Sequence, residues 1–322
     1  MESVMSKPFA SSADTHHQKA RLVELAPDVY GYISDFDPNT GMIFGGGEGL
    51  AIDCRATPRL ANEMLIEIKQ VNSAPITRLF LTHYHAVRVM GRAAFTDVHT
   101  VLCSEGTRAL IDERGAFDFE SEVRRFPRLF EAVEEVEGLT WPDQTFPQRT
   151  ILYMGDQEIH LEHLGSGHTR GDSVAWLPEH RVLFSGDLIE DRCALYCGDA
   201  YLHEWRETLE RLAARNARVV VPGRGDAIIG EENVRKAIDS TRGFLDDLLG
   251  GCDRAMQKKD ATLKEIFDAV YAEMTPKYGE WPIYEHCIPF NVSRAVDELK
   301  GLKEPSIWTA ERDAELWEAL QS

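Results

Sequence analysis

The sequence predicts an α/β (α+β) fold that is followed by a helical C-terminal extension. From about residue 26 to residue 230, short apolar runs alternate with helical patterns, and this β-α alternation occurs twice. After residue 231 the strand patterns disappear, and apolar residues recur at helical spacing to Leu320. The 43% hydrophobic and 28% charged content is typical of a folded globular chain. We therefore divide the chain into an arm (1–25), an α/β domain (26–230) and a helical extension (231–322).

The first third of the chain predicts an arm, a group of short strands and one surface helix. Residues 1–25 are polar and rich in small side chains, so we expect a poorly ordered arm. Between residues 29 and 54, apolar runs broken by glycine predict the strands of a sheet. Thr57 and Pro58 then supply an N-cap and a first-turn proline to a helix that reaches Val71.

The rest of the α/β domain continues the alternation. Apolar runs over residues 76–81 and 98–102 predict two strands joined by a short helical stretch, and a charged helical stretch follows. Strand patterns resume over residues 149–186. An amphipathic helix begins near Leu202, and a fully apolar strand is stopped by Pro222.

Composition excludes several partners and locations. The 35 Lys and Arg residues are outnumbered by 54 Asp and Glu, and the resulting net charge of −19 repels nucleic acid. No apolar segment of about 18 residues is present, so we expect neither a membrane span nor a signal peptide. Six cysteines are too few for a disulfide scaffold, so we expect reduced thiols. The sequence therefore favours a cytoplasmic protein that binds neither nucleic acid nor membranes.

Four residues with metal-binding side chains follow predicted strands. His83 and His85 come directly after the run over residues 76–81, and residues two apart on extended backbone point to the same side. His168 lies in a glycine-rich loop after a later strand, and Asp187 ends another strand. Because loops at strand ends build sites on rigid supports, we expect these side chains to share one edge of the domain.

The motifs THYH, GHTRGD and FSGD, together with a strand that ends PGRG, resemble the metallo-β-lactamase superfamily over roughly residues 27–230. The resemblance implies an αββα sandwich with a metal site at one edge between two sheets. It also implies that Asp53 and Thr82 support the metal ligands from behind. The implied ligands are three imidazoles and a carboxylate that bridges both metals where two are present: His83, His85, His168 and Asp187.

The sequence departs from the family pattern at the second metal. The first motif usually continues with Asp and His, and the late strand usually ends Pro-Gly-His-Gly, but this chain has Val87, Arg88 and Arg224 at those positions. Valine has no donor atom and a guanidinium has no lone pair. We therefore expect one divalent metal ion, zinc or iron. The two arginines either act in catalysis with Asp187, by holding it and clamping a substrate carboxylate or a developing oxyanion, or only neutralise it.

Three functions fit this site. The first is a hydrolase in which a single metal-bound water attacks an ester, thioester, lactone or amide of a small anionic substrate. The second is a mononuclear Fe(II) oxygenase similar to the persulfide dioxygenases of the superfamily, because an octahedral ion with four ligands keeps two open positions. The third is a pseudoenzyme whose arginines bind an anion without breaking a bond.

Further residues are candidates for the substrate pocket. Tyr196 and His203 lie in a segment that, by the resemblance, leads from the site into a helix. In the extension, Asn291 predicts a helix start that places Arg294 in the first turn, with His286 just before it. An alternative role for the extension is a homodimer contact made by its tryptophans: Trp281, Trp308 and Trp317.

Overall fold

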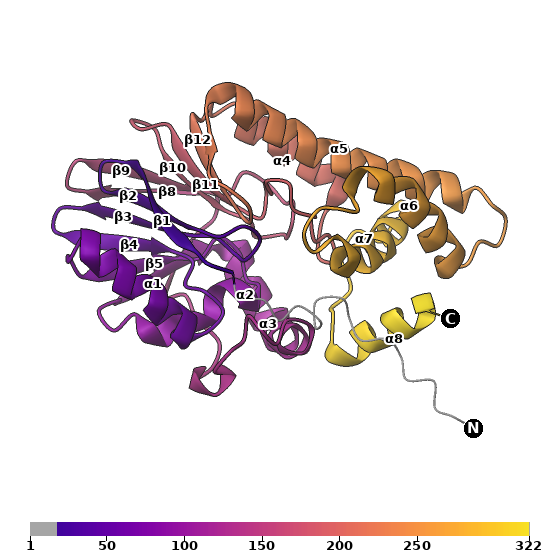
Figure 1. Ribbon diagram of the computed structural model, residues 1–322, viewed down its shortest axis with the longest axis horizontal. Coiled ribbons are helices and arrows are strands. Elements are labelled where there is room, and N and C mark those ends of the chain that lie inside the picture. The colour runs from indigo at the N-terminus through magenta and orange to yellow at the C-terminus, as the bar shows by residue number, and fades with distance from the viewer. Residues whose placement is uncertain (1–17, 322) are drawn as a thin grey trace.

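Two β-sheets packed face to face form the centre of the computed structural model, which describes residues 18–321 (Figure 1). The first sheet has seven strands, paired in chain order: β1 (Arg21–Ala26), β2 (Val29–Ile33), β3 (Thr40–Gly45), β4 (Glu48–Ile52), β5 (Ile76–Phe80), β6 (Thr100–Ser104) and β7 (Gln144–Phe146). The second has six strands in the order β13-β12-β11-β10-β9-β8: β8 (Arg149–Met154), β9 (Gln157–Glu162), β10 (Val174–Leu177), β11 (Val182–Gly186), β12 (Val219–Pro222) and β13 (Ile228–Ile229). Apolar side chains of both inner faces, among them Phe80 and Phe184, form the core between the sheets.

Helices cover the outer faces of both sheets and complete four layers. α1 (Pro58–Val71) and α3 (Glu105–Arg125) pack apolar side chains against the first sheet. α4 (Leu202–Ala213) and α5 (Glu231–Met256) pack against the second. Three short helical segments lie in the connections of the first half: α2 (Ala86–Val89), η2 (Met90–Ala94) and η3 (Val133–Glu135). The predicted αββα sandwich is confirmed.

Local sequence signals account for the helices that flank the site. Thr57 caps α1 because its side-chain oxygen accepts a hydrogen bond from the Leu60 backbone N–H at 3.3 Å, and Pro58 occupies the first turn. In α4, Trp205 and Leu209 lie on the predicted apolar face and are fully buried. Burial of such a face, rather than helix propensity alone, holds a helix of this length on the sheet.

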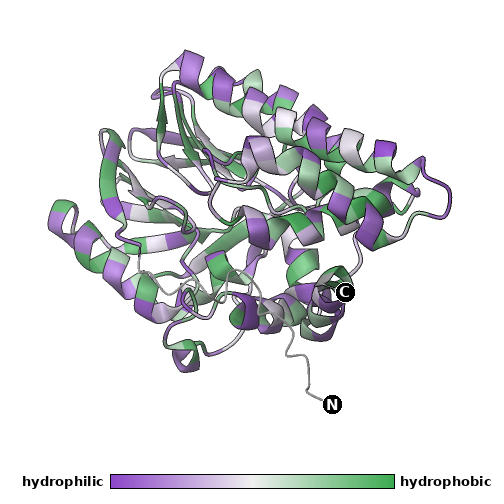
Figure 2. Cartoon of the chain, turned by 45° about the vertical axis from the view of Figure 1, so that its right-hand side comes forward, coloured by the Kyte–Doolittle hydropathy of each residue, from purple (hydrophilic) through white to green (hydrophobic). Residues whose placement is uncertain are grey.

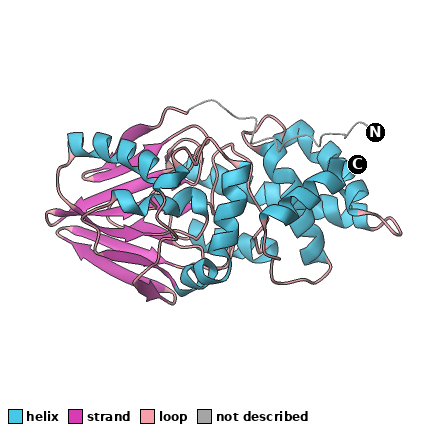
Figure 3. Cartoon of the chain, turned by 90° about the horizontal axis from the view of Figure 1, so that it is seen from below, coloured by secondary structure: helices cyan, strands magenta, loops and turns pink. Residues whose placement is uncertain are grey.

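The extension forms a helical body at one end of the sandwich (Figures 1 and 3). It consists of the distal part of α5 together with α6 (Leu263–Tyr278), α7 (Tyr284–Leu299) and α8 (Ala310–Gln321). Its helices carry both hydrophilic and hydrophobic residues (Figure 2), and Trp308 and Trp317 are buried within it. Across residues 18–321, no helix combines the length and the apolar character needed to cross a membrane.

Two local expectations are wrong. Residues 21–25 of the expected arm belong to strand β1, because antiparallel pairing with β2 supplies partners that local composition does not reveal. Residues 1–17 of that arm lie outside the described residues. The last long helix begins at Tyr284 rather than at Asn291, so Asn291 is buried inside α7 and Arg294 is not in a first turn. Tertiary hydrogen bonds of Asn291, described below, replace the predicted cap.

Candidate metal centre

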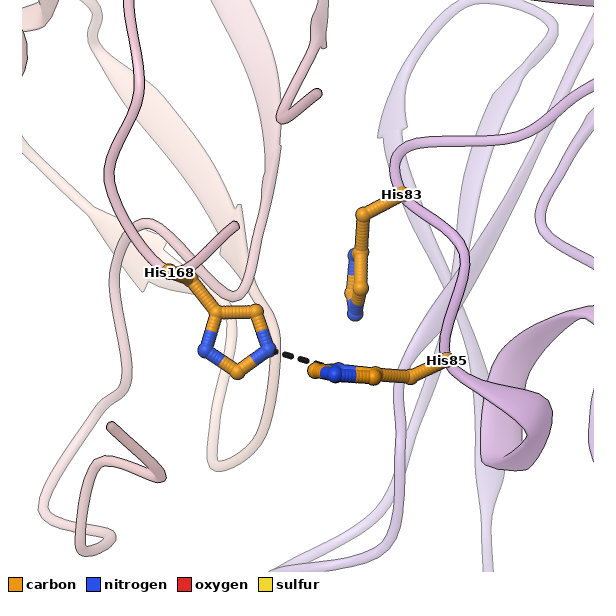
Figure 4. Close-up of side chains that lie close together, drawn as sticks. All are labelled: His83, His85 and His168. Carbon is orange, nitrogen blue, oxygen red and sulfur yellow. Dashed lines mark hydrogen bonds between the residues drawn. The ribbon is translucent and has the colours of Figure 1, made fainter. Parts of the chain in front are cut away.

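Three histidines from two separate segments converge at the edge of the sandwich (Figure 4). His83 and His85 follow β5 directly, and His168 lies in the loop after β9. One ring nitrogen from each lies within 4.8 Å of the other two, and all three side chains are buried. The structure therefore brings together the three imidazoles predicted from the sequence.

The hydrogen bonds behind His83 and His168 set their tautomers. The Thr82 hydroxyl donates to Asp53 Oδ2 at 2.8 Å, so it accepts from His83 Nδ1 at 3.0 Å, and the lone pair of His83 remains on Nε2. His168 Nδ1 donates to the backbone carbonyl of Tyr196 at 2.8 Å, which again leaves the lone pair on Nε2. Asp53 and Thr82 thus lie behind the ligands, as predicted, and orient His83.

The third tautomer is set by Asp199. His85 Nε2 donates to Asp199 Oδ2 at 3.3 Å, which directs the lone pair of His85 Nδ1 towards His168 Nε2, only 2.9 Å away. His83 Nε2 is buried and has no hydrogen-bond partner among the described residues. Two ring nitrogens this close must have either a proton or a cation between them, and a cation there would also engage the unpartnered His83 Nε2. The donor set therefore fits a divalent metal ion of the zinc type.

Burial and nearby charges tune these imidazoles. Burial lowers the pKa of His168 to about 3 and holds the pKa of His83 well below its usual value, so both are neutral and able to bind a metal. Burial alone would lower the pKa of His85 as well, but Asp118 and Asp199 outweigh it and raise that pKa to about 9. Metal binding at His85 Nδ1 would therefore release a proton.

Asp187 lies beside the imidazoles at the end of β11. Its Oδ2 is 3.6 Å from His83 Nε2 and 3.5 Å from His168 Nε2, close to the separation of about 3.3 Å between two ligands of a tetrahedral zinc ion. Oδ1 accepts a hydrogen bond from Arg88 Nη2, and Oδ2 accepts one from Arg224 Nη1 at 3.2 Å. Burial would raise the pKa of Asp187, but these two guanidinium groups hold it well below its usual value.

Arg88 occupies a buried position with four acceptors. Besides Asp187, it donates to the backbone carbonyls of Asn39 at 2.8 Å and Gly223 at 2.7 Å, and to Asp53 Oδ2 at 3.4 Å. Gly223 is needed at this point because a Cβ there would lie 2.2 Å from Asp187 Oδ1. Arg88 thus holds the Asp187 carboxylate and the backbone next to β3 and β12 in place.

Arg224 is placed differently. Its Nη1 alone makes both ion pairs, to Asp187 and to Glu190 Oε1 at 3.1 Å. Its Nε and Nη2 donate no hydrogen bond to the part of the chain that the structure describes, and the side chain lines the space beside the histidines. Burial raises the pKa of Glu190 to about 8, and the Asp187 charge adds to this effect.

Acidic residues missed by sequence reasoning hold the His85 segment. Asp118 and Glu122, both on α3, accept the backbone N–H groups of Ala86 at 2.7 Å and Val87 at 2.8 Å. These bonds satisfy the free donors at the start of α2, since its N-cap residue His85 makes no side-chain cap. No motif marks these residues, because helix α3 contributes them from far along the chain.

The four predicted pocket residues divide into two pairs. Tyr196 and His286 line the narrow space beside His85 and His168. His203 does not line this space, because its side chain is exposed and its Nδ1 forms a hydrogen bond with Glu298 Oε1 at 2.6 Å. Arg294 is buried but donates to the backbone carbonyls of three residues outside the site: Ala200, Leu302 and Lys303. The prediction that His203 and Arg294 line the pocket is therefore wrong.

Helix α7 contributes to the site through Asn291. Its side chain donates to the carbonyl of Leu195 at 2.8 Å and accepts the backbone N–H of Cys197 at 2.7 Å. Tyr196, whose carbonyl orients His168, lies between these two bonded residues. The extension therefore fixes the backbone that positions one of the three imidazoles.

Comparison with known proteins decides the family. The family model of the Metallo-beta-lactamase superfamily matches residues 33–224. This chain belongs to that superfamily. The superfamily match ends at Arg224, so it covers strands β3 to β12 and the four predicted metal ligands, but not α7.

Curated relatives match about three fifths of the chain at low identity. The type 2 metallo-beta-lactamase of Bacillus cereus is 24% identical over 203 residues, which are 61% of this chain and 71% of that protein. The type 2 metallo-beta-lactamase of Bacteroides fragilis is 24% identical over 218 residues, or 64% of this chain and 79% of that protein.

Solved structures of this superfamily also match the fold. A metallo-beta-lactamase from Pontibacter korlensis has a TM-score of 0.56 at 23% identity and covers 70% of this chain and 99% of its own. The inverting sec-alkylsulfatase Pisa1 from Pseudomonas sp. has a TM-score of 0.68 at 16% identity and covers 87% of this chain and 50% of its own. The second match is longer than the α/β domain, so it includes part of the helical extension.

Proposed function

We propose that this chain is a hydrolase that uses a single divalent metal ion to cleave an ester, thioester, lactone or amide of a small anionic substrate. The observation that carries the proposal is the convergence of three imidazole lone pairs and one carboxylate oxygen on a buried point. Membership of the metallo-β-lactamase superfamily supports hydrolysis as the reaction.

The two arginines support a stoichiometry of one metal. By the family pattern, a second metal would lie beside Asp187, where Arg88 and Arg224 bind both of its oxygens. A guanidinium cannot coordinate a cation, and two guanidinium charges repel one. They also share the charge of Asp187, so this carboxylate is a weaker fourth ligand than an unpaired one. A weak fourth ligand leaves room for water.

The protein groups around the centre have separate roles in this proposal. A bound zinc ion would supply Lewis acidity and a water molecule of lowered pKa. Arg224 lines the adjacent space with its Nε and Nη2 not bonded to the described residues, and it binds the substrate anion or the developing oxyanion. Glu122 lines the same space, and its Oε1 accepts no hydrogen bond from the described residues. Because burial raises the pKa of Glu122, Oε1 is suited to accept the proton of the attacking water.

Metal analysis with activity assays tests the proposal. Protein purified without added metal should contain about one zinc ion per chain and hydrolyse model esters or lactones, with activity lost on chelation and restored by zinc. His168→Ala should lose metal and activity, whereas His99→Ala, at an exposed position, should lose neither.

Other results would redirect the assignment. Two ions per chain would overturn the single-metal centre. Stoichiometric iron with substrate-dependent oxygen consumption would favour the oxygenase, and bound metal without any turnover would favour an anion-binding protein.

A further inference from the structure

A second, larger cavity adjoins the metal centre. It has a volume of about 310 Å³, at the lower end of the range of roughly 300–1,000 Å³ typical of small-molecule sites. The narrow space beside the histidines shares four lining residues with it: Phe126, Arg224, Ile283 and His286. This larger cavity, called the chamber below, therefore lies directly beside the metal centre and shares a wall with it.

The walls of the chamber are mainly apolar and come from three segments. Phe36 follows β2, Phe126 and Leu129 follow α3, and Trp281 and Ile283 lead into α7. The sandwich thus provides two walls and the extension provides the third. Such walls stabilise an apolar group in proportion to the area that it removes from water.

The charged groups at the chamber do not all offer a binding site. Arg128 is already paired with Asp37, at 2.9 Å, and Glu285 accepts a hydrogen bond from Tyr271 at 2.6 Å. Arg224 is the guanidinium that faces both spaces, with Nε and Nη2 making no hydrogen bond to residues 18–321. An anion in the chamber is therefore drawn to the junction with the metal centre.

His286 adds a neutral donor at this junction. Arg125 Nη1 lies 3.4 Å from His286 Nε2, and because a guanidinium only donates, Nε2 accepts and Nδ1 carries the proton. Nδ1 is buried and has no hydrogen-bond partner among the described residues. A buried donor without a partner is costly, and a ligand oxygen would satisfy it.

The backbone at the same junction is strained. Ile283 has φ 57° and ψ 8°, a left-handed conformation that β-branched residues rarely adopt. This conformation begins α7 and places Ile283 in the walls of both spaces. Strain of this kind concentrates where a binding site demands a particular geometry.

We propose that the chamber binds the apolar body of an amphipathic carboxylate, whose carboxylate group is held at the junction by Arg224 and His286. The inference rests on the proposed function, which it extends by naming the substrate class: a small anion with an alkyl or aryl body. The body lies against Phe36 and Trp281, and the reacting bond lies beside the metal centre.

Binding of a homologous series tests this assignment without turnover. Isothermal titration calorimetry of the full-length, zinc-loaded protein with butanoate, hexanoate and octanoate should show affinity rising about fourfold per added methylene. Octanoate should bind at least about tenfold more tightly than 1-octanol, which lacks the charge that Arg224 recognises. Equal affinity across the acids, or equal affinity for octanoate and octanol, would overturn the proposal.

Matched variants locate the site. Trp281→Ala should weaken octanoate binding about tenfold while retaining zinc, whereas Trp141→Ala, at a 47% exposed position away from the chamber, should leave it unchanged. Phe36→Ala, in a different segment, provides the same test if Trp281→Ala does not fold. If Trp281→Ala and Phe36→Ala both bind octanoate like the unmodified protein, the chamber is not its site. If affinity rises with chain length but the protein hydrolyses none of the model esters or lactones, the proposed function is refuted and the binding site is not.

Discussion

Replacing Arg88 by methionine tests whether this residue is a structural substitute for a second metal. Arg88 is 1% exposed and donates to two carboxylates and two backbone carbonyls. Arg88→Met keeps a similar volume but removes the donor to the Asn39 carbonyl, at a cost of about 1–3 kcal/mol. The Gly223 carbonyl still accepts the backbone N–H of Asn39 at 2.8 Å. Removing one partner of a buried ion pair costs about 3–5 kcal/mol. Arg224 still pairs with Asp187, and the apolar methionine side chain offsets about 2 kcal/mol.

We therefore expect Arg88→Met to lower the free energy of unfolding by about 4 kcal/mol, a large part of the 5–15 kcal/mol typical of a domain. Guanidinium chloride unfolding of the metal-free protein measures this value. The control is Arg206→Met, which removes a pair with Asp246 in which both side chains are nearly half exposed, and we expect a loss below about 1 kcal/mol. If Arg88→Met costs no more than the control, Arg88 does not hold the site together.

Three other changes have defined outcomes. Asp199→Ala should weaken zinc affinity about 10–100-fold because it removes the acceptor that orients His85 through Nε2; competition with a chromophoric chelator measures this. Burial raises the pKa of Glu190 to about 8, so the free energy of unfolding should fall as the pH rises from about 4.5 to about 8. Glu190→Gln removes this titration, so its free energy of unfolding relative to that of the unmodified protein should increase over the same range in urea titrations. A constant difference would contradict the assignment. Elemental analysis should find two metal ions per chain in the triple variant that restores the family ligands: Val87→Asp, Arg88→His and Arg224→His.

The fold and the convergence of the three histidines could be predicted because their signals are local. The strands have continuous apolar runs, and each predicted metal ligand directly follows a strand or lies in a glycine-rich loop. Asp187 is predicted by its place at the end of β11, and a parallel β11-β12 pair brings Arg224 to the same edge. Position at a strand end predicted that these side chains share one edge, and the resemblance to the superfamily supplied the prediction that they bind a metal.

The supporting residues could not be predicted, since their roles depend on the docking of distant segments. Asp118 and Glu122 resemble ordinary polar positions of a charged helix until α3 packs beside α2. Asp199 resembles a loop residue until His85 donates to it. His203 and Arg294 were misassigned for the same reason. Neither sequence spacing nor residue type reveals that His203 forms a hydrogen bond with Glu298, or that Arg294 donates to three backbone carbonyls outside the site.

The hydrogen bonds of Asn291 make the geometry of the metal centre depend on the helical extension. A chain shortened after β13 would keep every ligand in its sequence, yet it would lack the amide that clamps the backbone on either side of Tyr196. The carbonyl that fixes the His168 ring would then move with a loose loop. A chain truncated in this way would therefore contain all four predicted ligands but would hold the His168 ring less rigidly, and we expect it to bind a metal ion more weakly.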